Sequence, residues 1–210
     1  MVAWRVTLAA HRCPRCRFPA PGCLCAAVPA LRTRLEVVFL RHASERDRLT
    51  NTGHWAALAL ENSAVHEQGL LGAPLDASAL AVPGTWVLYP SPHPPPPGTP
   101  PPRRLVVPDG TWSQARRMMQ RIPALRALPR LPLPAPSAVR LRRPVAGGMS
   151  TLEAVASALR ALDEPAAAAA LERLLAEGVA LATRLRGGPG VAPPEGSRTG
   201  KARASGAAAR

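Results

Sequence analysis

Short apolar runs alternate with helical patterns along most of this 210-residue chain. The runs LEVVFL at 35–40, TWVLYP at 85–90 and RLVVPD at 104–109 are typical of buried strands. The segment 137–143 alternates apolar and basic residues and suits a half-exposed strand. Helical patterns are predicted at 53–62, 112–121, 151–162 and 166–185. Strands that alternate with helices predict an α/β fold with a mostly parallel sheet.

Composition divides the chain into three parts. Residues 1–30 hold all four cysteines, and residues 31–185 carry the strand and helix patterns of the predicted main domain. Residues 186–210 show no hydrophobic periodicity, so we expect a disordered basic tail, either solvated or in loose contact with RNA. The stretch PSPHPPPPGTPPP at 90–102 excludes a helix or a central strand. It predicts an extended polyproline connector or a ligand for a proline-binding module.

The charge of the chain favours a polyanionic partner. There are 27 basic and 13 acidic residues, a net charge of +14, which is typical of proteins that bind nucleic acid. Compositional bias is the alternative, because Lys201 is the only lysine, but exchanging lysine for arginine creates no net charge. No apolar run approaches the roughly 20 residues of a membrane span. The N-terminus lacks a signal-peptide pattern, so we expect a cytoplasmic protein with no membrane contact and no evident protein partner.

Four cysteines lie close together near the N-terminus, in the pattern Cys13-x-x-Cys16 followed by Cys23-x-Cys25. Disulfides are not expected in a cytoplasmic protein. Four thiolates at this spacing predict a tetrahedral structural zinc site, with redox thiols or an iron–sulfur site as alternatives.

Two capping boxes mark predicted helix starts: TWSQ at 111–114 and STLE at 150–153. Each follows a glycine-bearing turn, with Gly110 in the first case and glycines at 147–148 in the second. Helix N-termini beyond the carboxyl ends of strands favour carboxylate or phosphate groups. Capping boxes also begin many helices that bind no ligand, so they indicate a ligand site without establishing one.

Arginines follow the first capping box and close the half-exposed strand. Arg116 and Arg117 lie on the predicted helix, and Arg142 and Arg143 end the strand at 137–143. Together they predict a phosphate-binding surface, although a run of charges is also typical of a solvated helix face.

Several motifs in order resemble the DTW domain family. They are DGTW at 109–112 with the following SQARRM, the later LRRPVAGGMSTLEAVASAL, the cysteine cluster CPRCRFPAPGCLC, and the segment at 41–63 built around TNTG. The resemblance covers roughly residues 11 to 163. It implies a SPOUT-like fold, with helices on both faces of the sheet and a C-terminal knot. It also implies a tRNA-uridine aminocarboxypropyltransferase, which moves the 3-amino-3-carboxypropyl group of S-adenosylmethionine to N3 of a tRNA uridine and releases methylthioadenosine.

The resemblance suggests a role for each motif. Asp109 is the predicted catalytic residue and proton acceptor, but a nearby helix N-terminus would lower its pKa and favour an orienting role instead. Trp112 is expected to stack on a base or to pack in the core. The predicted S-adenosylmethionine site comprises Leu88, Tyr89, Pro90, Gly110, Thr111, Trp112, Gly147, Gly148, Ser150 and Thr151. The predicted RNA-binding residues are His42, Arg48, Arg116, Arg117, Arg142 and Arg143.

Three other functions remain open from the sequence. They are a SPOUT-type RNA methyltransferase, an aminocarboxypropyltransferase for ribosomal RNA, and a non-catalytic zinc-containing RNA-binding protein. The TNTG run at 50–53 has an alternative of its own, because Asn51 and Thr52 are also ordinary helix caps.

Overall fold

The computed structural model describes residues 12–19, 22–69, 75, 77–80, 82–91, 95, 97–131 and 149–185. Residues 132–148 lie outside this part of the chain. The predicted strand at 137–143 therefore lies outside the described residues. The expected knot depends on the same segment and stays a prediction. The predicted tail at 186–210 also lies outside the described residues.

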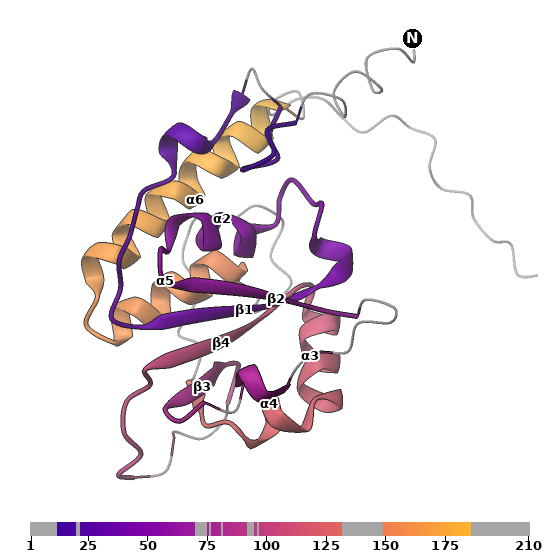
Figure 1. Ribbon diagram of the computed structural model, residues 1–210. Helices are drawn as coiled ribbons and strands as arrows, with labels where there is room; N and C mark the ends of the chain where they lie inside the picture. The colour runs from indigo at the N-terminus through magenta and orange to yellow at the C-terminus, as the bar shows by residue number, and fades with distance from the viewer. Residues whose placement is uncertain are drawn as a thin grey trace, which may run out of the picture.

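A parallel sheet forms the centre of the molecule (Figure 1). Its strands, within the described residues, are β1 Glu36–His42, β2 Ser63–Gln68, β3 Thr85–Leu88, β4 Arg104–Asp109 and β5 Arg130–Leu131. They are ordered β2-β1-β4-β3-β5, and every neighbouring pair is parallel. The prediction of an α/β fold with a parallel sheet is therefore confirmed.

The helices begin close to the predicted positions. The described α-helices are α2 Thr52–Ala59, α3 Trp112–Arg121, α4 Pro123–Ala127, α5 Thr151–Ala161 and α6 Pro165–Leu185. Short 3₁₀ turns are η2 Cys25–Ala27, η3 Ala43–Glu45 and η4 Ala77–Leu80. No helix in the described ranges is both long and apolar enough to cross a lipid bilayer.

Helices cover both faces of the sheet, as predicted (Figure 1). On one face, Val37 and Phe39 of β1 pack in a core with α2, α5 and α6. On the other face, Val38 and Leu40 pack in a core with α3 and α4. Successive side chains of one strand thus enter opposite layers, which explains why the run at 35–40 is so apolar. Each buried side chain of this kind contributes about 1.5–3 kcal/mol.

The described part of residues 1–30, which we call the cysteine segment, shares the core of the α2, α5 and α6 layer. Cys16, Phe18 and Leu24 are buried in that core. The Phe18 ring lies 5.6 Å, centroid to centroid, from the ring of Trp55 in α2. The segment runs beside the end of α6 (Figure 1). Its apolar side chains are therefore ordered by the main sheet layer as well as by any metal.

The sequence pattern does not predict β2, which is an edge strand. Its residues, SAVHEQ, are all half-buried or exposed, so they form no apolar run. The predicted helix at 53–62 extends three residues too far, because α2 ends at Ala59. Strand β3 ends at Leu88, two residues before the predicted end. The five-residue α4 and two-residue β5 are too short to show a periodicity.

Connections diverge from the two central strands β1 and β4. The connection from β1 through α2 leads to β2 on one side, and the connection from β4 through α3 and α4 leads to β5 on the other. The carboxyl ends of β1 and β4 are neighbours, with Arg41 opposite Asp109. Such a divergence is where open α/β sheets bind ligands, so the fold places Asp109 at the expected crevice.

Candidate functional site

Asp109 ends β4 and joins three segments of the chain. Its Oδ2 accepts a hydrogen bond from Asn51 Nδ2 at 2.9 Å, and its Oδ1 accepts one from Thr151 Oγ1 at 2.8 Å. Asn51 caps α2 and Thr151 is the first residue of α5. The carboxylate, in a residue only 2% exposed, therefore holds the starts of two helices at the end of the sheet.

Gly53 makes room for that carboxylate. A Cβ at this position would lie 2.4 Å from Asp109 Oδ1 and 2.6 Å from Oδ2, far inside van der Waals contact. The TNTG run thus supplies both an amide donor, Asn51, and the open space beside it. Asn51 also caps α2, the alternative role that the sequence left open, since its side chain accepts from the N–H of His54.

Burial governs the ionisation of Asp109. Desolvation raises the pKa of this carboxyl group, while the hydrogen bonds from Asn51 and Thr151 and then the charge of Arg41 oppose the rise. The expectation that the neighbouring helix N-terminus leaves a lowered pKa is therefore wrong. The charged carboxylate loses more stabilisation from water on burial than the hydrogen bonds from its neighbours restore.

Both predicted capping boxes are present. Thr111 Oγ1 accepts from the N–H of Gln114 at 3.3 Å, and Gln114 Oε1 accepts from the N–H of Thr111 at 2.7 Å. Ser150 and Glu153 form the same reciprocal pair, at 3.3 and 2.7 Å. A Cβ on Gly110 would lie 2.8 Å from Gln114 Oε1, so a glycine here lets the first box close. Helices α3 and α5 consequently both begin with capped ends near Asp109.

The residues predicted to bind S-adenosylmethionine differ in their exposure to solvent. Leu88 is 3% exposed and belongs to the core. Tyr89 and Trp112 are half-buried, with ring centroids 6.5 Å apart, and Pro90 is exposed. The Tyr89–Trp112 pair therefore lies at the surface beside the start of α3. The glycines at 147–148 lie outside the described residues.

The predicted RNA-binding arginines of α3 are exposed. Arg116 and Arg117 face away from the core, and Arg117 Nε donates to Ser113 O at 3.3 Å. Arg142 and Arg143 lie outside the described residues. Their proposed partnership with the α3 arginines stays a prediction.

The two other predicted RNA contacts follow β1. His42 Nδ1 lies 3.2 Å from Gln114 Nε2, which links the end of β1 to the first capping box. Arg48 is exposed and pairs with Glu45 at 3.3 Å. Both residues border the same edge of the sheet as Asp109, and their contact with RNA stays a prediction.

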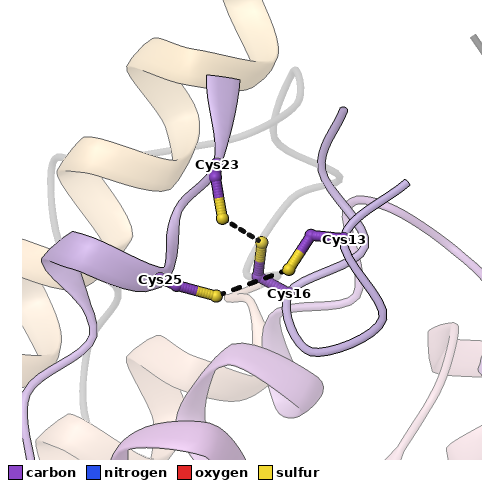
Figure 2. Close-up of side chains that lie close together, drawn as sticks. All are labelled: Cys13, Cys16, Cys23 and Cys25. Atoms are coloured by element: carbon purple, nitrogen blue, oxygen red, sulfur yellow. Dashed lines mark hydrogen bonds between the residues drawn. The ribbon is translucent and has the colours of Figure 1, made fainter. Parts of the chain in front are cut away.

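The four cysteines converge on one point, as Figure 2 shows. Their sulfur atoms all lie within 4.8 Å of one another. Sγ of Cys13 is 3.6 Å from Sγ of Cys25, and Sγ of Cys16 is 3.5 Å from Sγ of Cys23. These separations exceed the ~2.05 Å of a disulfide. They are close to the ~3.8 Å edge of a tetrahedron of sulfurs with Zn–S bonds of ~2.3 Å, so the group fits a zinc ion.

The surroundings of the thiols differ. The backbone N–H groups of Cys16 and Arg15 lower the pKa of Cys13 to about 6. Burial, followed by the neighbouring thiols, raises the pKa of Cys25 to about 12. A divalent cation among the sulfurs would favour the thiolate form of all four. His54 Nε2 donates to the carbonyl of Arg15 at 2.7 Å and fastens this loop to α2.

The sequence pattern does not identify Asn51 and Gly53 as partners of Asp109. A signal for them exists, because TNTG and DGTW each follow a predicted buried strand. The carboxyl ends of parallel strands share one edge of a sheet, so motifs that follow them meet there. Which side chains touch, however, depends on strand order.

Comparison with known proteins supplies the remaining observation. The sequence model of the DTW domain matches residues 10–181. A curated relative, tRNA-uridine aminocarboxypropyltransferase 2 of Drosophila melanogaster, is 30% identical over 175 residues, covering 73% of this chain and 67% of the relative. No solved structure matches the chain.

Proposed function

Because the chain belongs to the DTW domain family, we propose that it is an S-adenosylmethionine-dependent tRNA-uridine aminocarboxypropyltransferase. The observation that carries the proposal is the convergence of the TNTG, DGTW and STLE motifs on Asp109, at the diverging ends of β1 and β4. The relative's name gives the reaction, and the net charge of +14 suits an RNA substrate.

The proposed reaction is a single displacement at carbon. N3 of the uridine attacks the carbon bonded to the sulfonium of the donor, and the carbon–sulfur bond breaks as the carbon–nitrogen bond forms. Sulfur keeps the electron pair and leaves as the neutral thioether of methylthioadenosine. The N3 proton must pass to an acceptor in the site or to water. The protein's task is therefore to align two reactants and receive one proton.

Asp109 is the proposed catalytic residue. Burial raises its pKa, which suits a proton acceptor better than an ordinary surface aspartate. Both of its oxygens already accept hydrogen bonds. One of these bonds must therefore break or weaken before Asp109 can accept the N3 proton. The alternative role is positioning, in which Asp109 keeps Asn51 and Thr151 in place while the proton leaves elsewhere.

The start of α5 is the proposed binding site for the carboxylate of S-adenosylmethionine. Its cap is closed by Ser150 and Glu153, and Thr151 anchors it to Asp109. Free N–H groups in a first helical turn favour a carboxylate. The half-buried rings of Tyr89 and Trp112 lie at the start of α3 and are proposed to face the adenine or the uracil.

The cysteine cluster has a structural role in this proposal. Cys13, Cys16, Cys23 and Cys25 would hold a zinc ion with all four of its positions filled by protein. Bound zinc would supply a crosslink for the segment, and the segment's own side chains pack against α2.

A reaction of purified protein, S-adenosylmethionine and unmodified tRNA tests the proposal, with nucleosides and small products identified by mass spectrometry. Aminocarboxypropyl-uridine together with methylthioadenosine is the expected result. A methylated nucleoside with S-adenosylhomocysteine would overturn the transferred group. Product on ribosomal RNA but not on tRNA would overturn the substrate. RNA binding without any product would favour the binding-only function.

Asp109→Asn separates the two roles of Asp109. The asparagine has nearly the same shape, and the Thr151 hydroxyl can reverse to accept from the new amide, so both contacts persist. A proton acceptor, however, is lost. Unchanged stability with activity reduced by about a hundredfold or more would support proton acceptance. Unchanged activity would establish the positioning role.

A further inference from the structure

A second site lies between the cysteine segment and the carboxyl ends of β1 and β2, in a cavity of about 460 Å³. Arg12 and Arg17 of the cysteine segment form one wall. Arg41 of β1 and Arg46, after η3, form the other. None of these four arginines is among the residues that the sequence predicts to bind RNA.

Positive charge exceeds negative charge around this cavity. Its acidic residues are Asp47 and Glu67. Glu67 is already shared between two guanidinium groups, Arg41 at 2.6 Å and Arg46, and these lower its pKa to about 2. Four arginines therefore face two carboxylates, of which one is saturated by its ion pairs.

Two guanidinium nitrogen atoms of the lining arginines are buried and have no hydrogen-bond partner in the described part of the chain. Arg17 Nη1 and Arg41 Nε make no hydrogen bond to any described residue, although both are shielded from solvent. Arg41 as a whole is only 8% exposed. Arg17 and Arg41 come from opposite walls of the same cavity. Unpaired buried donors of like charge are costly unless an anion joins them.

We propose that this cavity binds a backbone phosphate of the RNA substrate. Guanidinium groups bind phosphate through paired N–H donors. Four arginines around one cavity can approach a single phosphate together, which arginines spread over a flat surface cannot do. Phosphate contacts fix the register of an RNA on a protein without reading its sequence.

The position of the cavity suits a phosphate contact that holds the RNA near Asp109. Arg41 lies opposite Asp109 in the pairing of β1 with β4, and both side chains extend from the same face of the sheet. A phosphate held by Arg41 and Arg17 would thus fix the RNA strand beside the proposed transfer site. The cysteine cluster acquires a function here, because its loop carries Arg12 and Arg17 to the cavity wall.

The test uses full-length protein and a fluorescent, unmodified tRNA transcript, titrated at several salt concentrations. Arg17→Ala and Arg46→Ala remove one cation from each wall. Arg15→Ala is the matched control, because Arg15 is an exposed arginine of the same cysteine loop that does not line the cavity. Metal content and melting temperature are measured for every variant, so that a damaged cysteine site is recognised.

The expected result is a loss of tRNA affinity of about tenfold for each wall variant and a salt slope lower by about 0.7–0.9. Arg15→Ala is expected to change the affinity by less than about twofold. Equal losses for all three variants would mean diffuse surface charge and overturn the site. Unchanged tRNA affinity with weakened S-adenosylmethionine binding would also overturn it, because the cavity would then hold the donor's carboxylate. If Arg17→Ala loses metal, Arg46→Ala alone decides.

The inference rests on the proposed function only in taking tRNA as the RNA. Binding and transfer are measured separately, so the two failures are distinguishable. Wild-type protein that transfers the group while Arg46→Ala binds tRNA normally would refute the cavity alone. Loss of tRNA binding in Arg46→Ala with no transfer by wild-type protein would refute the proposed reaction alone.

Discussion

Replacing Gly53 by alanine is expected to destabilise the protein through Asp109. Alanine in a helix is ordinarily better than glycine by about 1 kcal/mol. Here the added Cβ would lie 2.4–2.6 Å from the three carboxylate atoms of Asp109, so something must shift. Overpacking costs about 1–3 kcal/mol. Displacing the carboxylate from one of its donors, Asn51 or Thr151, costs about 1.5–3 kcal/mol more. The net loss is about 1.5–5 kcal/mol.

A double-mutant cycle isolates this contact. Urea unfolding followed by circular dichroism is measured for wild type, Gly53→Ala, Asp109→Ala and the double variant. In the Asp109→Ala background the clash is absent, so Gly53→Ala should be neutral or stabilise by up to about 1 kcal/mol. A cost that is the same in both backgrounds would refute the reasoning, because the first turn of α2 would then not rest on the carboxylate.

Three further predictions concern the cysteine segment and its support. We expect about one zinc ion per chain by elemental analysis, and Cys16→Ser should lower both metal content and melting temperature; full metal retention would contradict the site. Burial lowers the pKa of His54 from 6.5 to about 4, so the unfolded chain binds the extra proton and stability falls as pH drops from 6.5 toward 4. The loss is about 1–2 kcal/mol once partial exposure is allowed for, and an unchanged pH profile in His54→Gln would refute it. Gly178→Ala should lower the melting temperature, since its Cβ would lie 2.4 Å from the Trp55 ring; an unchanged value would show that α6 can shift at no cost.

Local patterns predicted most of the regular structure. The runs at 35–40 and 104–109 are buried strands because alternate side chains enter two helical layers, and such two-sided burial leaves an apolar run in the sequence. The edge strand β2 leaves no such trace, because its side chains remain partly exposed. Both capping boxes were readable because their hydrogen bonds join residues three positions apart.

The candidate site was only partly readable. Asp109 is prominent because it ends an apolar run and precedes a capping box. The direction of its pKa shift was not readable, because proximity to a helix start predicts a lowered value whereas burial by α2 and α5 raises it. Burial of a side chain at a strand end depends on which helices cover it.

Local patterns in the chain predict which runs are strands, where helices begin, and which four thiols lie close enough to share a metal. These features depend on contacts within a few residues, which periodicity and spacing record. The contacts of Asp109 with Asn51 and Thr151, which lie 58 and 42 positions away, follow from the folded chain and not from any local pattern. The same holds for the arginines of the cysteine segment that line a cavity with Arg41. The strand order β2-β1-β4-β3-β5 makes these meetings possible, and strand order is fixed by the packing of the whole sheet between its helices.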